Sequence, residues 1–218
     1  MKRLAPLTLA LFLLPSIALA ASAGSHDETE RLNRADMTLA KRATAHKGDL
    51  AAGWRLVRSG PPTSGDDPCS SFDPDLSAFV ITGKHETSFS HSSGAQLMSD
   101  IGVFRNVRDA AGDFKASAKP GFLRCLRIVM QQGLRQANLR AKITSSRMST
   151  TPRVGAQSVS YRVVATVYPT NGVPRFNMYA DFLAFRQGRS QAVLLFMAPL
   201  APVRGQVALA RSVARRMR

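Results

Sequence analysis

A chain of 218 residues with a formal net charge of +16 is long enough to bury one core of ample size, and its basicity favours anionic partners. The hydrophobic fraction of 44% argues against a disordered chain, and the pattern of short apolar runs argues against a multi-span membrane protein. Most of the 30 basic residues are arginine. Charge alone does not choose among nucleic acid, phosphate-bearing polymers and a lipid surface.

The N-terminus has the order of a secretory signal peptide. Lys2 and Arg3 precede an apolar stretch that ends near Leu19, and small residues follow it. The stretch is shorter than the roughly 20 residues that a membrane-spanning helix needs. We expect residues 1–23 to be a signal peptide, with cleavage after Ala20 or Ala23, and a retained anchor is the alternative. The cleaved protein is then secreted or extracytoplasmic, in the cell envelope, without a transmembrane span.

The segment 24–34 is polar and charged, which predicts a flexible leader, and 35–218 is expected to be a single exported domain. Residues 37–45 predict a short helix that ends before Gly48. Residues 54–57 predict a strand that begins at Trp54, the only tryptophan. An indole buries a large area, so we interpret Trp54 as a packing anchor over the sheet, with ligand stacking as the alternative.

A loop rich in Pro, Gly and Asp leads to Cys69. Its acidic residues, with those that follow the cysteine, do not have the spacing of an EF-hand, so no metal site is predicted there. The chain contains only two cysteines, Cys69 and Cys125. Two cysteines in an exported chain most simply form one intramolecular disulfide.

Two strands are predicted over residues 79–90 and 97–104, joined as a hairpin. His85 and His91 lie in this region. They are six residues apart along an extended chain, which is too far for both to bind one metal ion. We interpret both as surface residues, and we predict neither a metal nor a cofactor.

Residues 107–118 predict a short amphipathic helix, and 120–138 predict a longer one around which the chain is organised. In the longer helix Phe122, Cys125, Leu126, Val129, Gly133 and Ala137 recur at helical spacing on one face. The opposite face carries a basic ridge. Its arginines Arg124, Arg127 and Arg135 are the candidate anion-binding residues of this sequence, although solvated surface arginines are the simpler interpretation for each one alone.

The C-terminal third predicts strands over 139–148, 159–167, 176–186 and 191–197, and a final helix from Pro202. The expected fold class is therefore α+β, with a twisted antiparallel sheet of about six strands, helices packed on one side, and one disulfide.

Several short pieces resemble a group of exported actinobacterial-type domains: residues 49–54 (DLAAGW), Cys69 with residues 72–77 (FDPDLS), Thr82-Gly83, and Cys125-Leu126. More distantly, the chain resembles the extracellular sensor domains of actinobacterial serine/threonine kinases and PsbP-like lipoproteins. The resemblance covers residues 35–218 and implies an antiparallel sheet with packed helices. It implies no catalytic residues. The group tends to have proline where this chain has Ala51.

The sequence lacks the common hydrolase, zinc-protease and phosphate-loop motifs. Asp75, His85, Glu86, His91 and Asp181 are the acid/base candidates, and any chain of this length contains such a set. We therefore expect a protein that is not an enzyme: a noncatalytic exported ligand-binding or sensor-like domain, with a cleft or sheet face for a small apolar ligand. The alternative is a basic envelope protein that associates with an anionic wall polymer or lipid headgroups. Nucleic acid is not the expected physiological partner.

Overall fold

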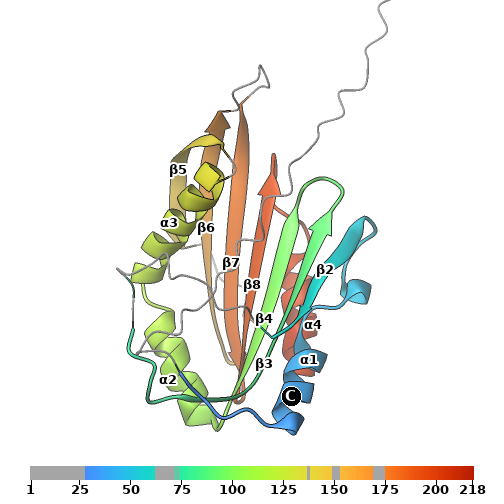
Figure 1. Cartoon of the computed structure of the whole chain (residues 1–218), viewed down its shortest axis with the longest axis vertical. Helices are drawn as coiled ribbons and strands as arrows, with labels where there is room; N and C mark the ends of the chain where they lie inside the picture. Colours follow the sequence, from blue (N-terminus) through green and yellow to red (C-terminus); the bar gives the residue numbers. More distant parts are fainter. Residues whose placement is uncertain (1–27, 62–71, 73, 137, 149–152, 169–174) are drawn as a thin grey trace, which may run out of the picture.

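The computed structural model describes residues 28–61, 72, 74–136, 138–148, 153–168 and 175–218. Within this part of the chain, eight strands form one sheet, in the order β1-β3-β4-β8-β7-β6-β5, and β2 also pairs with β3 (Figure 1). The strands are β1 (Thr29–Glu30), β2 (Trp54–Gly60), β3 (Val80–His91), β4 (Gln96–Phe104), β5 (Arg140–Met148), β6 (Gln157–Tyr168), β7 (Phe176–Gln187) and β8 (Ser190–Pro199). The prediction of about six strands was therefore too low.

All strand pairs are antiparallel except β1 with β3. β1 lies within the segment 24–34 that was predicted to be a flexible leader. Its backbone joins the edge of β3, where the N–H of Thr29 donates to the carbonyl of Phe79 at 2.9 Å. That prediction was wrong for Thr29 and Glu30, because backbone pairing orders a segment that has no apolar pattern of its own.

In the part of the chain that the structure describes, four α-helices cover both faces of the sheet: α1 (Arg34–Ala43), α2 (Val107–Ser117), α3 (Gly121–Gln136) and α4 (Gln206–Arg216). α1 and α4 share one core with the sheet, and α2 and α3 share the other. The prediction of helices on one side was wrong. The neighbours Leu194 and Leu195 in β8 show the reason, since they point into opposite cores and both are at least 97% buried.

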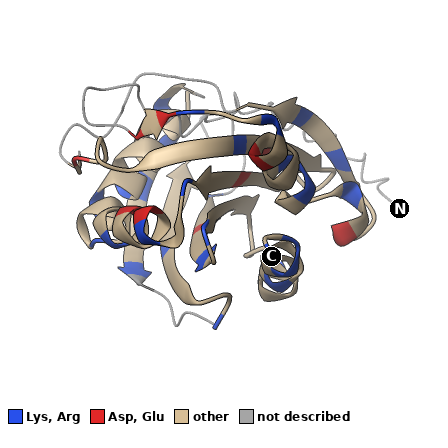
Figure 2. Cartoon of the chain, turned by 90° about the horizontal axis from the view of Figure 1, so that it is seen from below, with Lys and Arg blue, Asp and Glu red and all other residues tan. Residues whose placement is uncertain are grey.

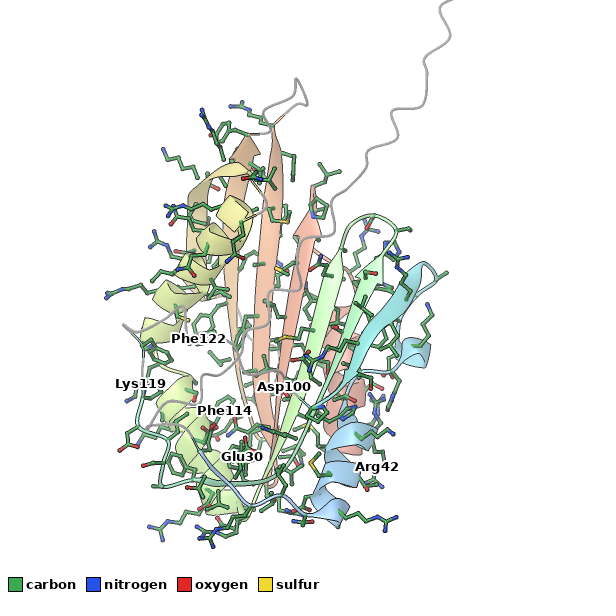
Figure 3. The ribbon with its side chains drawn as sticks, viewed as in Figure 1. Glu30, Arg42, Asp100, Phe114, Lys119 and Phe122 are labelled. Carbon is green, nitrogen blue, oxygen red and sulfur yellow. The ribbon has the colours of Figure 1, made fainter. Side chains whose placement is uncertain are left out.

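The central helix forms as predicted, with bounds at Gly121 and Gln136. Cys125, Leu126, Val129 and Gly133 are buried, as expected from their spacing. Its first turn is fixed by an aromatic cluster, in which the Phe122 ring lies 4.4 Å from that of Phe182 and 5.7 Å from that of Tyr161, measured between ring centroids. Figure 3 shows Phe122 and Phe114 on the side of the sheet that carries α3 and α2.

The predicted disulfide falls partly outside the described residues, because Cys69 lies in the segment 62–71. Cys125 is 5% exposed and packs with Val129 against Phe72. It is not a free thiol. The pairing of Cys125 with Cys69 stays a prediction, and Phe72 shows that the chain close to Cys69 reaches α3.

Candidate functional site

The acid/base candidates do not come together. The side chain of Asp75 accepts hydrogen bonds from the Ser77 N–H and hydroxyl in a local turn. Asp181 forms an ion pair with Arg162 and accepts from Gln206. His91 packs against Trp54, with ring centroids 5.2 Å apart.

His85 is the exception to the expected exposure of the histidines, because it is 7% exposed. Its Nε2 lies 3.1 Å from the hydroxyl of Ser59. Burial, followed by the charges of Lys41 and His46, lowers the pKa of His85. Its neighbour Glu86 follows it along β3, where successive side chains point to opposite faces of the sheet. His85 and Glu86 therefore do not form one acid/base pair.

Carboxyl groups gather instead on the α2 side of the sheet, a cluster that the sequence analysis missed. Glu86 on β3 is paired in register with Asp100 on β4, and burial raises the pKa of both, that of Asp100 to about 7. Figure 3 labels Asp100 near the middle of the sheet. Asp113 of α2 is 4% exposed and accepts from Gln191 at 2.5 Å. Burial, with the adjacent Glu28, raises the pKa of Asp113.

This cluster does not have the geometry of a metal centre. Among the described residues, no group of three or more His, Cys, Asp or Glu side chains is arranged to hold a metal ion. Its buried Asp100 Oδ1 and Asp113 Oδ2 have no hydrogen-bond partner, which agrees with the raised pKa of both groups.

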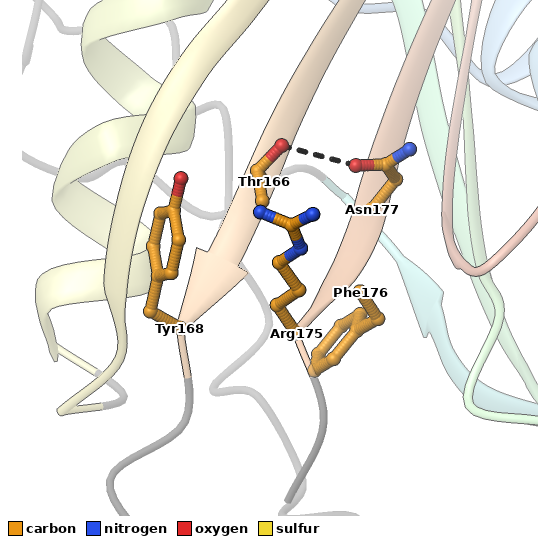
Figure 4. Close-up of a pocket in the computed structure, with 5 residues that line it drawn as sticks. All are labelled: Thr166, Tyr168, Arg175, Phe176 and Asn177. Atoms are coloured by element: carbon orange, nitrogen blue, oxygen red, sulfur yellow. Dashed lines mark hydrogen bonds between the residues drawn. The ribbon is translucent and has the colours of Figure 1, made fainter.

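One hollow lies where β6 ends and β7 begins (Figure 4). It has a volume of about 400 Å³ and is lined by Thr166, Tyr168, Arg175, Phe176 and Asn177. The Thr166 hydroxyl donates to the Asn177 amide oxygen at 3.1 Å, which fixes two of the polar side chains. The hollow is open and mixed in character, and its only charged side chain is that of Arg175.

A second hollow, of about 230 Å³, lies between α4 and the segment that leads into β6. Four of its lining residues are arginines and none is acidic; the lining is Arg153, Val154, Gly155, Gln187, Arg211, Ala214, Arg215 and Arg218. We call it the arginine pocket. Figure 2 shows the helix beneath the C label, α4, with basic positions in blue and no acidic position in red.

The predicted arginine ridge of α3 is exposed along its length. Arg124, Arg127 and Arg135 all face solvent, opposite the buried face of the helix. None of them has an ion-pair partner among the described residues, where the arginines with carboxylate partners are Arg58, Arg105, Arg162, Arg189 and Arg216. The ridge and the arginine pocket are on different helices and on opposite sides of the sheet.

No helix in the described part of the chain is long and apolar enough to cross a membrane.

Most of the polar contacts that were not predictable join elements that are far apart in sequence. Arg189, at the turn between β7 and β8, donates to Asp36 of α1 at 2.5 Å and to the carbonyl of Phe104 at 3.0 Å. Hydrogen bonding to Arg189, chiefly, lowers the pKa of Asp36 well below its ordinary value.

No protein-family model matches this chain, and no curated protein matches it by sequence. The extracellular domain of PknH from Mycobacterium tuberculosis is a structural neighbour, with a TM-score of 0.46 and 7% sequence identity over 86% of this chain and 97% of that domain. The likeness is weak, and no function is carried over from it. The comparisons therefore give no support for the resemblance to PsbP-like proteins.

Proposed function

We propose that this protein is a noncatalytic, exported domain of the cell envelope that binds an anionic polymer through its unpaired arginines. The observation that carries the proposal is the ridge of Arg124, Arg127 and Arg135, which presents three guanidinium groups to solvent with no carboxylate partner in the described part of the chain. Guanidinium groups match phosphate and carboxylate oxygens in pairs of hydrogen bonds, which suits a polymer with repeated anionic groups.

Two further features support this function. The acid/base candidates are distributed over separate contacts, which supports a noncatalytic role. Both described hollows are lined mainly by polar and basic side chains, which favours an anionic ligand over the small apolar ligand of a sensor-like cleft. The envelope location is supported separately, by the predicted signal peptide.

The test is the binding of long-chain polyphosphate, measured by titration calorimetry at NaCl concentrations from about 50 to 200 mM. We expect the affinity to fall steeply as salt increases, because each neutralised phosphate releases a condensed counterion. The triple variant R124Q/R127Q/R135Q should reduce the slope of log affinity against log salt by about 2, since three contacts at about 0.7 each are lost.

The matched control is R31Q/R34Q/R204Q, which removes the same charge from three exposed arginines elsewhere. It should change the slope by much less than the ridge variant does. Failure to bind polyphosphate, or binding that is insensitive to salt, would contradict the proposal. So would binding to phosphatidylglycerol vesicles alone, because the ligand would then be a lipid surface.

A further inference from the structure

We infer that the arginine pocket is a discrete binding site for a multiply charged phosphate group, such as a phosphomonoester or one end of a polyphosphate chain. The inference rests on the proposed anion-binding function and locates a specific site for it. The pocket is distinct from the α3 ridge, because it is concave and lies on the other side of the sheet.

The four arginines come from two segments that are far apart in sequence. Arg211, Arg215 and Arg218 lie at successive turns along one stripe of α4 and its C-terminal extension. Arg153 lies about sixty residues earlier, in the chain that enters β6. The fold therefore brings Arg153 to the stripe, and this proximity does not follow from any local propensity.

The backbone around Arg153 is held in place. Val154 is 2% exposed and packs in the same core as Ala210, Val213 and Ala214 of α4. Gly155 has a φ of +65°, and a Cβ at this position would overlap the carbonyl of Arg186. This close approach allows the N–H of Ala156 to donate to the Arg186 carbonyl at 2.8 Å. Arg153 is therefore presented from an anchored segment.

Within the described residues, no acidic side chain lines the pocket. None of the four arginines has a carboxylate partner among the described residues, and Arg42 adds a further cation by donating to the carbonyl of Arg218 at 3.5 Å. Like charges at a spacing of four residues on a helix repel one another. The negative end of the helix dipole explains Arg215 and Arg218 but not Arg153, which lies outside the helix.

The size and composition of the pocket indicate the class of ligand. Its 230 Å³ is below the range of about 300 to 1,000 Å³ that is usual for drug-sized ligands, so it suits one small group. The amide of Gln187 adds a neutral polar group beside the arginines. Several guanidinium groups around one small space favour a group with more than one negative charge over the singly charged phosphodiester of a lipid headgroup.

The test uses tripolyphosphate, which is too short to bridge the pocket and the α3 ridge, with binding measured by calorimetry on the whole exported protein. We expect R211Q/R215Q to weaken binding at least tenfold, and R153Q alone to weaken it severalfold. The variant R108Q/K115Q loses the same charge from exposed positions of α2, on the other side of the sheet, and should bind tripolyphosphate within about twofold of the wild type, since charge loss at a distant exposed site is largely screened.

An unchanged affinity for tripolyphosphate in both R211Q/R215Q and R153Q would overturn the inference. The proposed function would still be tested separately, by the salt-dependent binding of long polyphosphate. Arg153 and the α4 arginines are exposed, so thermal unfolding of each variant should match the wild type. Binding to phosphatidylglycerol vesicles that is lost in R211Q/R215Q, without binding of tripolyphosphate, would also overturn it, because the site would then recognise a singly charged headgroup.

Discussion

Asp113 shows how a single carboxyl group couples this fold to pH. It is enclosed between α2 and the sheet, where Gln191 donates to Oδ1 while Oδ2 has no donor. The neighbouring charge that acts on it is that of Glu28, which has the same sign and also raises the pKa of Asp100. A charged Asp113 is therefore unfavourable in the folded protein.

We predict that D113N stabilises the protein at pH 8 by about 2 kcal/mol. Because the pKa of Asp113 is raised in the folded state, folded molecules bind more protons than unfolded ones above about pH 4, and the free energy of unfolding falls as the pH rises through the folded pKa. Urea unfolding of both proteins between pH 4 and 8 provides the measurement. The curves should converge at low pH, and parallel curves over the whole range would contradict the prediction.

At the scale of residues, the spacing of apolar residues along a helix predicted which side chains are buried. Contacts between residues far apart in sequence were not predicted. The spacing of Cys125, Leu126 and Val129 identified the buried face of α3, but Met130 and Leu134 were missed, although both are 4% exposed. The helix buries a stripe wider than one row of residues, because it packs over both β5 and β6. His85 was expected on the surface, but it is buried and contacts Ser59 of the neighbouring strand β2, a contact that no local pattern encodes.

At the scale of elements, the backbone of α1 comes very close to the sheet at Gly83 of β3. A Cβ at this position would overlap the backbone carbonyl of Asp36, which belongs to the first turn of α1. The same helix is held at its other end, where the N–H of Ala45 donates to the Ser99 hydroxyl at 3.1 Å. Glycine is therefore required at position 83 for α1 to lie this close to the sheet.

We predict that G83A lowers the free energy of unfolding by about 2 kcal/mol or more, because an overlap with backbone atoms cannot be relieved by a side-chain rotation. G102A is the matched control, since it adds the same methyl group on the adjacent strand β4, where it would make ordinary contacts with the Phe104 ring at 3.5 Å and the Ile81 side chain at 3.9 Å. Denaturant unfolding measures both. Equal stabilities of the two variants would show that α1 moves freely away from β3.

The side of the sheet on which each helix packs could not be predicted from helical periodicity. The pattern identifies the apolar face of the helix but not the face of the sheet that it covers. The strands contained a clearer signal. Buried residues alternate along β6 from Tyr161 to Val167, whereas Leu194, Leu195 and Phe196 form a continuous buried run in β8. Such a run is typical of a strand covered on both faces. It was visible in the sequence and would have indicated helices on both sides of the sheet.

At the scale of the whole molecule, the predicted Cys69–Cys125 disulfide links α3 to a segment that precedes β3. We predict that C69S/C125S lowers the free energy of unfolding by roughly 4 kcal/mol, because the bond closes a loop of more than fifty residues in the unfolded chain. Urea unfolding compares the variant with the wild type. Thiol titration of the wild-type protein, unfolded without reductant, should find no free thiol, and two thiols would contradict the pairing.

The anion-binding surfaces were only partly predictable, because one of them depends on how the whole chain folds. The ridge Arg124, Arg127 and Arg135 lies on one helix, so its spacing was sufficient to group these residues. The arginine pocket depends on Arg153 meeting α4 across the fold, and no spacing along the chain relates them. Net charge indicated an anionic partner, but it could not indicate where on the surface positive charge is concentrated.

The pairing of β1 with β3 has a consequence for maturation. Thr29 enters the sheet only six residues after Ala23, the later of the two expected cleavage positions. At about 3.3 Å per residue, a fully extended chain of that length reaches roughly 20 Å. A protease that binds the cleavage site as an extended strand at the membrane therefore competes with β3, which pairs with the backbone of Thr29 and Glu30 only a few residues away. Processing is easiest before β1 docks, so release from the membrane and completion of the sheet edge are expected to occur in that order.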